Sequence, residues 1–306
     1  MNAKRLSRFL PPFLFAILMQ FVAFFTLTHA AVAPPTGDHL ALLAIKSMIK
    51  VDPQGVMTSW NHSITNFCQW QGVYCGHSRH HRVTILDLPS SGLIGTLSPS
   101  IGNLSFLRFI RLQNNSFSGE IHPEIGRLFR LQELDLYNNS FTGNIPATIM
   151  NCSNLQVLNL GRNNLVGKIS DEIGLLSMLN LLMLRKNILE GGIPPFISNL
   201  TLLETLSLGN CQLGGSIPDV FQRLRNLRTL VVPGNNLTGT IPPSFYNCSS
   251  LEQVVLDDNQ LNGRLHENIG LKLPRLQLLL IKGRLVIVEQ LTLLKPLLYR
   301  SPCDHK

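Results

Sequence analysis

The chain has 306 residues, of which 44% are hydrophobic and 14% are charged. This composition excludes a disordered, solvating segment and indicates a protein with a large apolar core. The net charge of +8 would suggest a nucleic-acid binder, but residues 9–271 contain 16 basic and 16 acidic side chains. The excess positive charge lies at the two ends of the chain, so no nucleic-acid partner is expected.

Residues 1–30 have the layout of a secretory signal peptide. Three Lys and Arg side chains precede an apolar stretch over residues 9–27, and small residues surround a cleavage point after Ala30. The alternative, an uncleaved membrane anchor, is disfavoured by the Pro11-Pro12 break. Charged residues interrupt the most apolar later segment, from Leu276 to Leu298, so no membrane span is expected in the mature chain.

Eight N-x-S/T sequons agree with a secreted chain, because N-glycosylation takes place only in the secretory pathway. The predicted N-glycosylation sites are Asn61, Asn103, Asn114, Asn138, Asn151, Asn199, Asn236 and Asn247.

A 24-residue repeat runs through most of the chain. Six asparagines share one register, and Ser91 and Cys211 hold the two remaining positions of the series. A glycine follows four residues after each position, from Gly95 to Gly263, in all eight copies. Three apolar residues in the spacing L-x-x-L-x-L precede each position. The six register asparagines are Asn115, Asn139, Asn163, Asn187, Asn235 and Asn259.

The spacing of the repeat predicts its structure. The L-x-L step has period two, which indicates a short strand with both leucines on one face. A single unit cannot bury that face, whereas stacked units form a continuous core beside a parallel sheet. The amide of each register asparagine can bond the backbone of neighbouring coils, and the glycine supplies a positive φ or a close approach.

This unit, extended by I-P after the glycine as in Ile145-Pro146, resembles the plant extracellular leucine-rich repeats. The resemblance implies an α/β solenoid, a plant-type leucine-rich-repeat horseshoe with a parallel concave sheet. It assigns residues 37–79 to an amino-terminal cap and residues 80–281 to about eight full repeats and a partial ninth. Residues 282–306 are then a non-repeat tail.

The region before the repeats resembles the amino-terminal cap of plant leucine-rich-repeat receptor kinases, including the immune pattern-receptor type. A helix that begins near Gly37-Asp38 is followed by the chain's two tryptophans, Trp60 and Trp70. Cys68 and Cys75 are closely spaced in a secreted chain and are predicted to form a disulfide.

No group of residues suggests catalysis. The sequence has no nucleophile elbow, no phosphate-binding glycine loop and no kinase motif, so we expect neither an enzyme nor a cofactor. His77, His80 and His81, with Arg79 and Arg82, are interpreted as a solvated loop rather than a metal site. Cys152 and Cys248 replace core leucines of the repeat and are predicted to be buried thiols.

A binding surface is the remaining functional candidate. The outward positions of the concave sheet include an Arg, Tyr and Met cluster that resembles interface composition, although ordinary variability of a solvated sheet explains it as well. We expect a peptide, protein or glycan ligand there. The predicted ligand-binding residues are Phe109, Arg111, Tyr137, Arg162, Arg185 and Lys186.

The resemblance implies an extracellular ligand-recognition module of a receptor-like kinase, in defence or developmental signalling, with a co-receptor kinase as a possible partner. A secreted polygalacturonase inhibitor with the same coil is the alternative. The repeat pattern stops after Ile281, so the chain is expected to be a shortened receptor, either a real product or a broken gene model. We expect it in the apoplast, or at the plasma membrane as part of a longer receptor.

Overall fold

The computed structural model describes residues 37–61, 66–76 and 81–281, and the backbone of residues 284–287. The predicted signal peptide and most of the predicted tail lie outside the described residues. Among the residues described, no helix is both long enough and apolar enough to span a bilayer.

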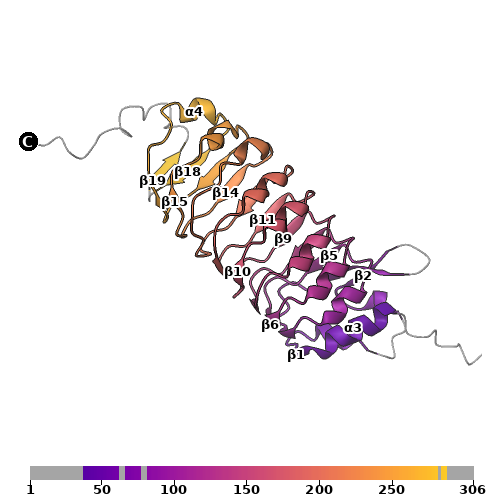
Figure 1. Ribbon diagram of the computed structural model, residues 1–306. Coiled ribbons are helices and arrows are strands. Elements are labelled where there is room, and N and C mark those ends of the chain that lie inside the picture. Colours follow the sequence, from indigo (N-terminus) through magenta and orange to yellow (C-terminus); the bar gives the residue numbers. More distant parts are fainter. Residues whose placement is uncertain (1–36, 62–65, 77–80, 282–283, 288–306) are drawn as a thin grey trace, which may run out of the picture. The chain divides into compact units, whose positions relative to one another are not determined.

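Successive repeats form successive coils, and each coil adds one short strand to an 11-stranded sheet (Figure 1). The strands from β3 to β18 are parallel, and antiparallel β2 and β19 pair with the two outer strands. The sheet consists of β2 (Val73–Cys75), β3 (Val83–Asp87), β5 (Phe109–Arg111), β7 (Glu133–Asp135), β9 (Val157–Asn159), β11 (Leu181–Met183), β13 (Thr205–Ser207), β14 (Thr229–Val231), β16 (Gln253–Val255), β18 (Leu278–Ile281) and β19 (Arg284–Ile287).

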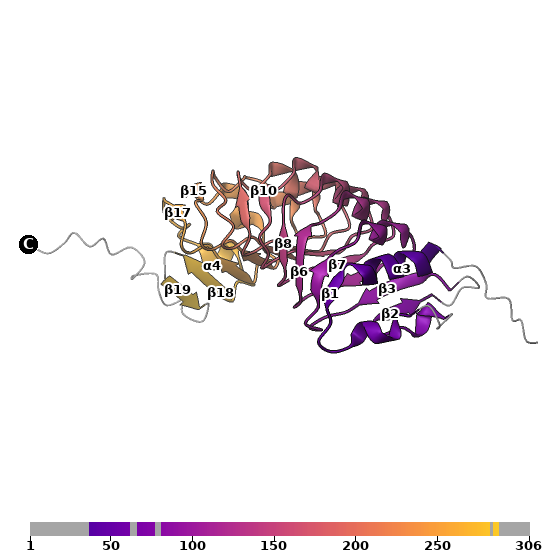
Figure 2. The same cartoon turned by 90° about the horizontal axis from the view of Figure 1, so that it is seen from below.

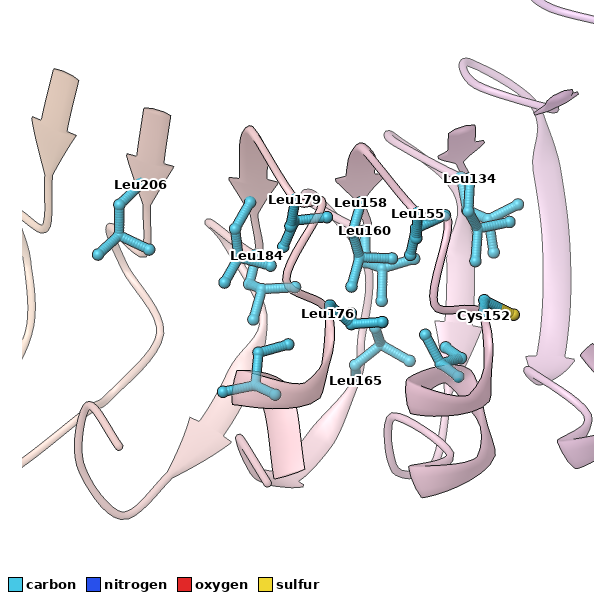
Figure 3. Close-up of a cluster of buried hydrophobic side chains, with 14 of the residues drawn as sticks. Leu134, Cys152, Leu155, Leu158, Leu160, Leu165, Leu176, Leu179, Leu184 and Leu206 are labelled. Carbon is cyan, nitrogen blue, oxygen red and sulfur yellow. The ribbon is translucent and has the colours of Figure 1, made fainter. Parts of the chain in front are cut away.

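The predicted leucines form the core of this solenoid. Leu134, Leu158, Leu182 and Leu206 pair in register across four neighbouring strands and are buried. Figure 3 shows Leu134, Leu158 and Leu206 between the strands and the helical turns on the opposite side of the coils. Cys152 takes the place that Leu176 has in the next coil, which confirms the prediction of a buried thiol.

Short 3-10 helices line the side of the coils opposite the long sheet. Several begin with proline, whose fixed φ and missing N–H suit the first turn of a helix. The 3-10 helices are η1 (Val56–Ser59), η2 (Phe67–Gln69), η3 (Pro99–Asn103), η4 (Pro123–Arg127), η5 (Ala147–Asn151), η6 (Asp171–Leu175), η7 (Pro195–Asn199), η8 (Phe221–Arg223) and η9 (Pro243–Asn247). Within the described residues the α-helices are α3 (Gly37–Ser47) and α4 (Ile269–Lys272).

A second set of strands follows the turn of most coils, and β1 of the cap joins this set. These strands form a four-stranded sheet and two separate pairs, in the order β1-β4-β6-β8, β10-β12 and β15-β17. They are β1 (Ile49–Val51), β4 (Ile94–Thr96), β6 (Ser116–Glu120), β8 (Ser140–Thr142), β10 (Val166–Lys168), β12 (Ile188–Glu190), β15 (Thr238–Gly239) and β17 (Gln260–Leu261).

The register asparagines bond each coil to the one before it. Asn163 Nδ2 donates to the carbonyls of Leu136 and Leu160, each at 3.0 Å, and its Oδ1 accepts from Phe141 N at 3.0 Å. Cys211 keeps one of these bonds, a contact of 3.1 Å from Sγ to the Leu184 carbonyl. We call this series of side chains, one in each coil, the asparagine ladder. A thiol cannot present the amide's separate donor and acceptor, so the ladder bonds this coil more weakly to the one before it.

The repeat requires glycine at this position for two different structural reasons. Gly167 has a φ of +78°, which strains any residue with a Cβ. Gly95 instead lies against the cap, where a Cβ would come within 2.3 Å of the Met48 carbonyl oxygen. The positive φ explains most copies, and the close approach explains the first.

The cap is locked onto the first coil by an ion pair. The Asp38 side chain is only 1% exposed, accepts two hydrogen bonds from Arg82 at 2.8 and 2.9 Å, and accepts a third from Val83 N. For Arg82 the prediction of a solvated loop is therefore wrong, because a partner 44 residues away holds it. His77, Arg79 and His80 lie outside the described residues.

The cap lies beside the first coils (Figure 2), and its aromatic side chains pack together as a small cluster. The Trp60 and Trp70 rings stack with centroids 5.4 Å apart, and both side chains are buried. The predicted disulfide between Cys68 and Cys75 is confirmed, with a Cα–Cα distance of 5.6 Å.

Candidate ligand-binding face

We call one surface of the solenoid the sheet face. It consists of the outward side chains of the long sheet and, in each coil, of the two residues that follow the last core leucine after the strand. The repeat places equivalent positions of neighbouring coils side by side, so the sheet face consists of columns with one residue per coil. All six residues predicted to bind ligand lie on it, in the coils of β5, β7, β9 and β11.

Arg111 is held by an acidic neighbour on the next strand. Its Nε and Nη2 donate to the two carboxylate oxygens of Glu133 at 2.8 and 2.6 Å. The hydrogen bond to Glu133 raises the pKa of Arg111 further above its ordinary value. The guanidinium also lies 5.1 Å from the Phe109 ring centroid. These contacts fix the orientation of Arg111 and leave the outer side of the pair to solvent.

Tyr137 and Arg185 meet although a coil lies between them. Arg185 Nη2 donates to the Tyr137 hydroxyl at 2.9 Å, and the guanidinium carbon lies 5.2 Å from the ring centroid. The intervening coil has Gly161 in the same column. A Cβ on Gly161 would come within 3.3 Å of both Tyr137 Cδ2 and Arg185 Cγ, so the glycine makes room for the contact.

Arg162 and Lys186 occupy the next column, where the chain turns off the strand. Both are exposed and adopt left-handed backbone conformations, with φ of +52° and +57°. Asn114 and Asn138 hold the same position in earlier coils, where Asn138 Nδ2 donates to Asn114 Oδ1 at 3.1 Å. The basic side chains therefore project from the edge of the sheet face, beside the Tyr137–Arg185 contact.

A half-buried carboxylate lies between these two contacts. Burial raises the pKa of Asp135 above its ordinary value, although Tyr137 N donates to its Oδ1 at 3.0 Å. The raised pKa marks Asp135 as a partly desolvated charge on the sheet face.

Two acceptor atoms in the column of Tyr137 have no hydrogen-bond partner within the part of the chain that the structure describes. They are Gln113 Oε1, one coil before Tyr137, and Asp257 Oδ1, further along the solenoid. Both oxygens are buried, and an unpaired buried acceptor is costly to the stability of the fold.

The structure thus groups the predicted residues into pairs rather than one cluster. Phe109 and Arg111 lie together on β5, Tyr137 and Arg185 meet across a coil, and Arg162 and Lys186 line the edge. Sequence reasoning missed the pairing roles of Glu133 and Gly161. The column arrangement carried a signal for Gly161, because a glycine between two large side chains in one column opens a gap.

The structure also bears on two other kinds of chemical site, metal sites and reactive thiols. In residues 37–61, 66–76 and 81–281, no three His, Cys, Asp or Glu side chains come together as a metal site would require. Cys152, Cys211 and Cys248 are buried free thiols, and burial raises the pKa of Cys152 to about 12 and that of Cys211 to about 11. Such thiols are protonated and unreactive at neutral pH.

Three family patterns match the chain. A leucine-rich-repeat N-terminal domain matches residues 35–76, and a pair of leucine-rich repeats matches residues 130–173. The single leucine-rich repeat matches residues 106–128, 202–224 and 226–248. The chain is a leucine-rich-repeat protein.

Its relatives are plant receptor kinases and their ectodomains. A receptor-like serine/threonine kinase of Arabidopsis thaliana, EFR, is 51% identical over 26% of this leucine-rich-repeat protein and 8% of its own length. The matched segments cover between 8% and 14% of the curated relatives.

Solved structures extend the likeness along the solenoid. The ectodomain of the Arabidopsis thaliana receptor kinase GASSHO1/SCHENGEN3, in complex with CASPARIAN STRIP INTEGRITY FACTOR 2, matches 78% of this chain with 30% identity and a TM-score of 0.76. It is covered over 29% of its length. The Arabidopsis receptor kinase HAESA, in complex with the peptide hormone IDA and the co-receptor SERK1, matches 80% of this chain and 41% of its own, with 31% identity and a TM-score of 0.72.

Proposed function

We propose that this leucine-rich-repeat protein is an extracellular ligand-recognition module of the plant receptor-kinase type, and that the sheet face of β5, β7, β9 and β11 binds a peptide. A co-receptor kinase would be a second partner, and the module would act at the plasma membrane or in the apoplast. The chain would bind and not catalyse, since kinase activity belongs to other regions of its relatives.

The Tyr137–Arg185 contact is the observation that carries this proposal. A guanidinium held against an aromatic ring has lost most of its side-chain freedom before a ligand arrives, and such preorganisation lowers the entropic cost of binding. Arg111, fixed by Glu133, is ordered in the same way. Tyrosine and arginine are also the residues that most often dominate binding energies at interfaces.

The arrangement suits an extended chain. Fixed side chains at successive strands are spaced by about 4.8 Å per coil. A peptide crossing the strands could therefore meet one column position after another. HAESA, which was solved with the peptide hormone IDA, supports the same class of ligand.

A selection from a displayed random dodecapeptide library tests the proposal. The full chain is secreted, immobilised and used to select binders. We expect their affinity to fall at least tenfold for the fourfold variant R111A/Y137A/R162A/R185A. The matched control, S118A/T142A/K168A/E190A, removes four exposed side chains from the second set of strands and should bind as the wild type does.

Circular dichroism would verify that both variants are folded. If the fourfold variant binds the selected peptides with unchanged affinity, the ligand site lies elsewhere. Inhibition of a polygalacturonase by the secreted chain would instead support the inhibitor alternative.

A further inference from the structure

Four of the eight sequons share one structural position. Each of these asparagines is the last residue of a 3-10 helix on the side of the coils opposite the long sheet. Successive members are 48 residues apart, so they fall on every second coil. They are Asn103 of η3, Asn151 of η5, Asn199 of η7 and Asn247 of η9, and we call them the asparagine row.

The fold presents each of these sequons outward. The middle residue of each one is buried, as Leu104 and Cys248 illustrate, and it anchors the segment in the core. The asparagine before it and the hydroxyl residue after it then point away from the core. Asn103, Asn151 and Asn247 are exposed, and Asn199 is half-buried.

The alternation leaves room between neighbouring sites. The intervening coils have Arg127, Leu175 and Arg223 at the same position. Two coils correspond to about 10 Å at the strand spacing, which separates one attachment point from the next. Sugars on the row would therefore stand side by side along one flank.

An exposed apolar patch lies beside Asn199. Phe196 is 52% exposed and Leu175 is 62% exposed, and Met178 and Leu202 are also exposed. Phe196 precedes Asn199 by three residues within η7, and side chains three residues apart in a 3-10 helix lie one above the other. Gly174 of the previous coil lies beneath, where a Cβ would come within 3.1 Å of Asn199 Nδ2.

We propose that the asparagine row is N-glycosylated, and that the first N-acetylglucosamine on Asn199 packs on the Phe196 ring and covers this apolar patch. In the transfer step, the Asn Nδ2 lone pair forms a bond to C1 of the sugar. The C1–O bond to the lipid diphosphate donor breaks, the lipid diphosphate leaves with that electron pair, and the amide loses one proton.

The other three sites provide an internal comparison. The residues three positions before Asn103, Asn151 and Asn247 are Ser100, Thr148 and Ser244, none of them aromatic. The C–H groups of a sugar gain contact area against the face of an aromatic ring, and the small polar residues cannot offer such a platform. Only the Asn199 sugar gains this contact, so its effect on stability should differ from those of its neighbours.

The proposal goes beyond ligand recognition, because it assigns a role to the flank opposite the sheet face. Sugars on the row would shield that flank and its exposed leucines from other proteins. Ligands would then approach the solenoid from the sheet face.

The first experiment measures occupancy on the full chain secreted from plant cells. Enzymatic release of the glycans in ¹⁸O-water converts each occupied asparagine to ¹⁸O-labelled aspartate, which peptide mass mapping detects. We expect label at all four row positions in most molecules. Absence of label at Asn199, or at two or more row positions, would mean that the sequons reflect only the repeat pattern, and it would overturn the proposal.

The second experiment tests the Phe196 contact with a double-mutant cycle. T201A removes the Asn199 sequon and leaves the asparagine in place, and F196S installs the residue type found at this position in other coils. T201A should lower the unfolding midpoint by about 2 °C in the wild-type background and leave it unchanged in the F196S background.

S153A, which removes the Asn151 sequon, is the matched control and should have the smaller effect. Enzymatic removal of the glycans from the folded wild type and from F196S gives a second measurement without the T201A change. If T201A lowers the midpoint equally in both backgrounds, the sugar does not pack on Phe196.

Discussion

Arg185 and Tyr137 form a hydrogen bond of 2.9 Å across an intervening coil, and the glycine of that coil keeps the space between them open. The two side chains are 48 residues apart in sequence but lie in the same column of the sheet face. This contact fixes two side chains of the face before a ligand binds.

Filling the gap at Gly161 should separate the pair. We expect Y137A and R185A to show a coupling free energy of about 0.5–1 kcal/mol in the wild type, the range for an exposed cation–π contact. In a G161V background the coupling should disappear, because the valine side chain displaces the guanidinium. Urea unfolding of the single and double variants measures it, and an unchanged coupling in G161V would contradict this role for the glycine.

The cap should depend on the Asp38–Arg82 pair. D38A leaves a half-buried guanidinium and the Val83 N–H without their acceptor, so we expect a loss of about 3 kcal/mol in the free energy of unfolding. E204A is the control, since the 4.0 Å pair of Glu204 with Arg228 is exposed and contributes below about 1 kcal/mol. Similar losses in the two variants would show that Asp38 does not lock the cap.

The asparagine ladder can be completed or broken by single changes. C211N restores the amide that the other coils use, and it should stabilise the chain by about 1 kcal/mol. N163C makes the opposite change in a coil with a complete set of bonds and should destabilise it by at least that amount. Thermal unfolding of both variants checks the prediction, and it fails if C211N lowers the midpoint.

The half-buried carboxylate of Asp135 predicts a pH dependence of stability. Because burial raises the pKa of Asp135 in the folded state, the folded chain binds its proton more tightly than the unfolded chain does. Stability from this group is present below the ordinary pKa of 3.8 and is lost as the pH rises through the folded-state value.

D135N keeps an oxygen for the Tyr137 N–H and carries no charge. Its stability relative to the wild type should therefore increase between about pH 3 and pH 7. Urea unfolding of both proteins across this range measures the difference. A difference that stays constant with pH would show that Asp135 titrates normally.

The core could be read from the sequence because each of its contacts follows from the repeat. Leu134, Leu158 and Leu182 are 24 residues apart and lie side by side, and the disulfide joins two nearby cysteines. The contacts on the sheet face do not follow from the repeat, since they depend on the charge and size of the individual side chains.

Arg111 pairs with a residue 22 positions away on the next strand, which the column arrangement does not single out. The repeat does not predict the partner of Arg82 either, because Asp38 lies in the cap, before the repeat begins. The identities of the outward residues could thus be predicted, but their pairings depend on distances that only the folded chain defines.

The asparagine ladder links each coil to the one before it, so a whole 24-residue unit could be deleted or duplicated by recombination with little harm to the core. The Tyr137–Arg185 contact would not survive such an event in the coil of β9, because it spans two units. The contact therefore requires a fixed number of repeats between Tyr137 and Arg185. Changes in repeat number outside this span would preserve the ordered part of the face, and changes within it would alter what the face can bind.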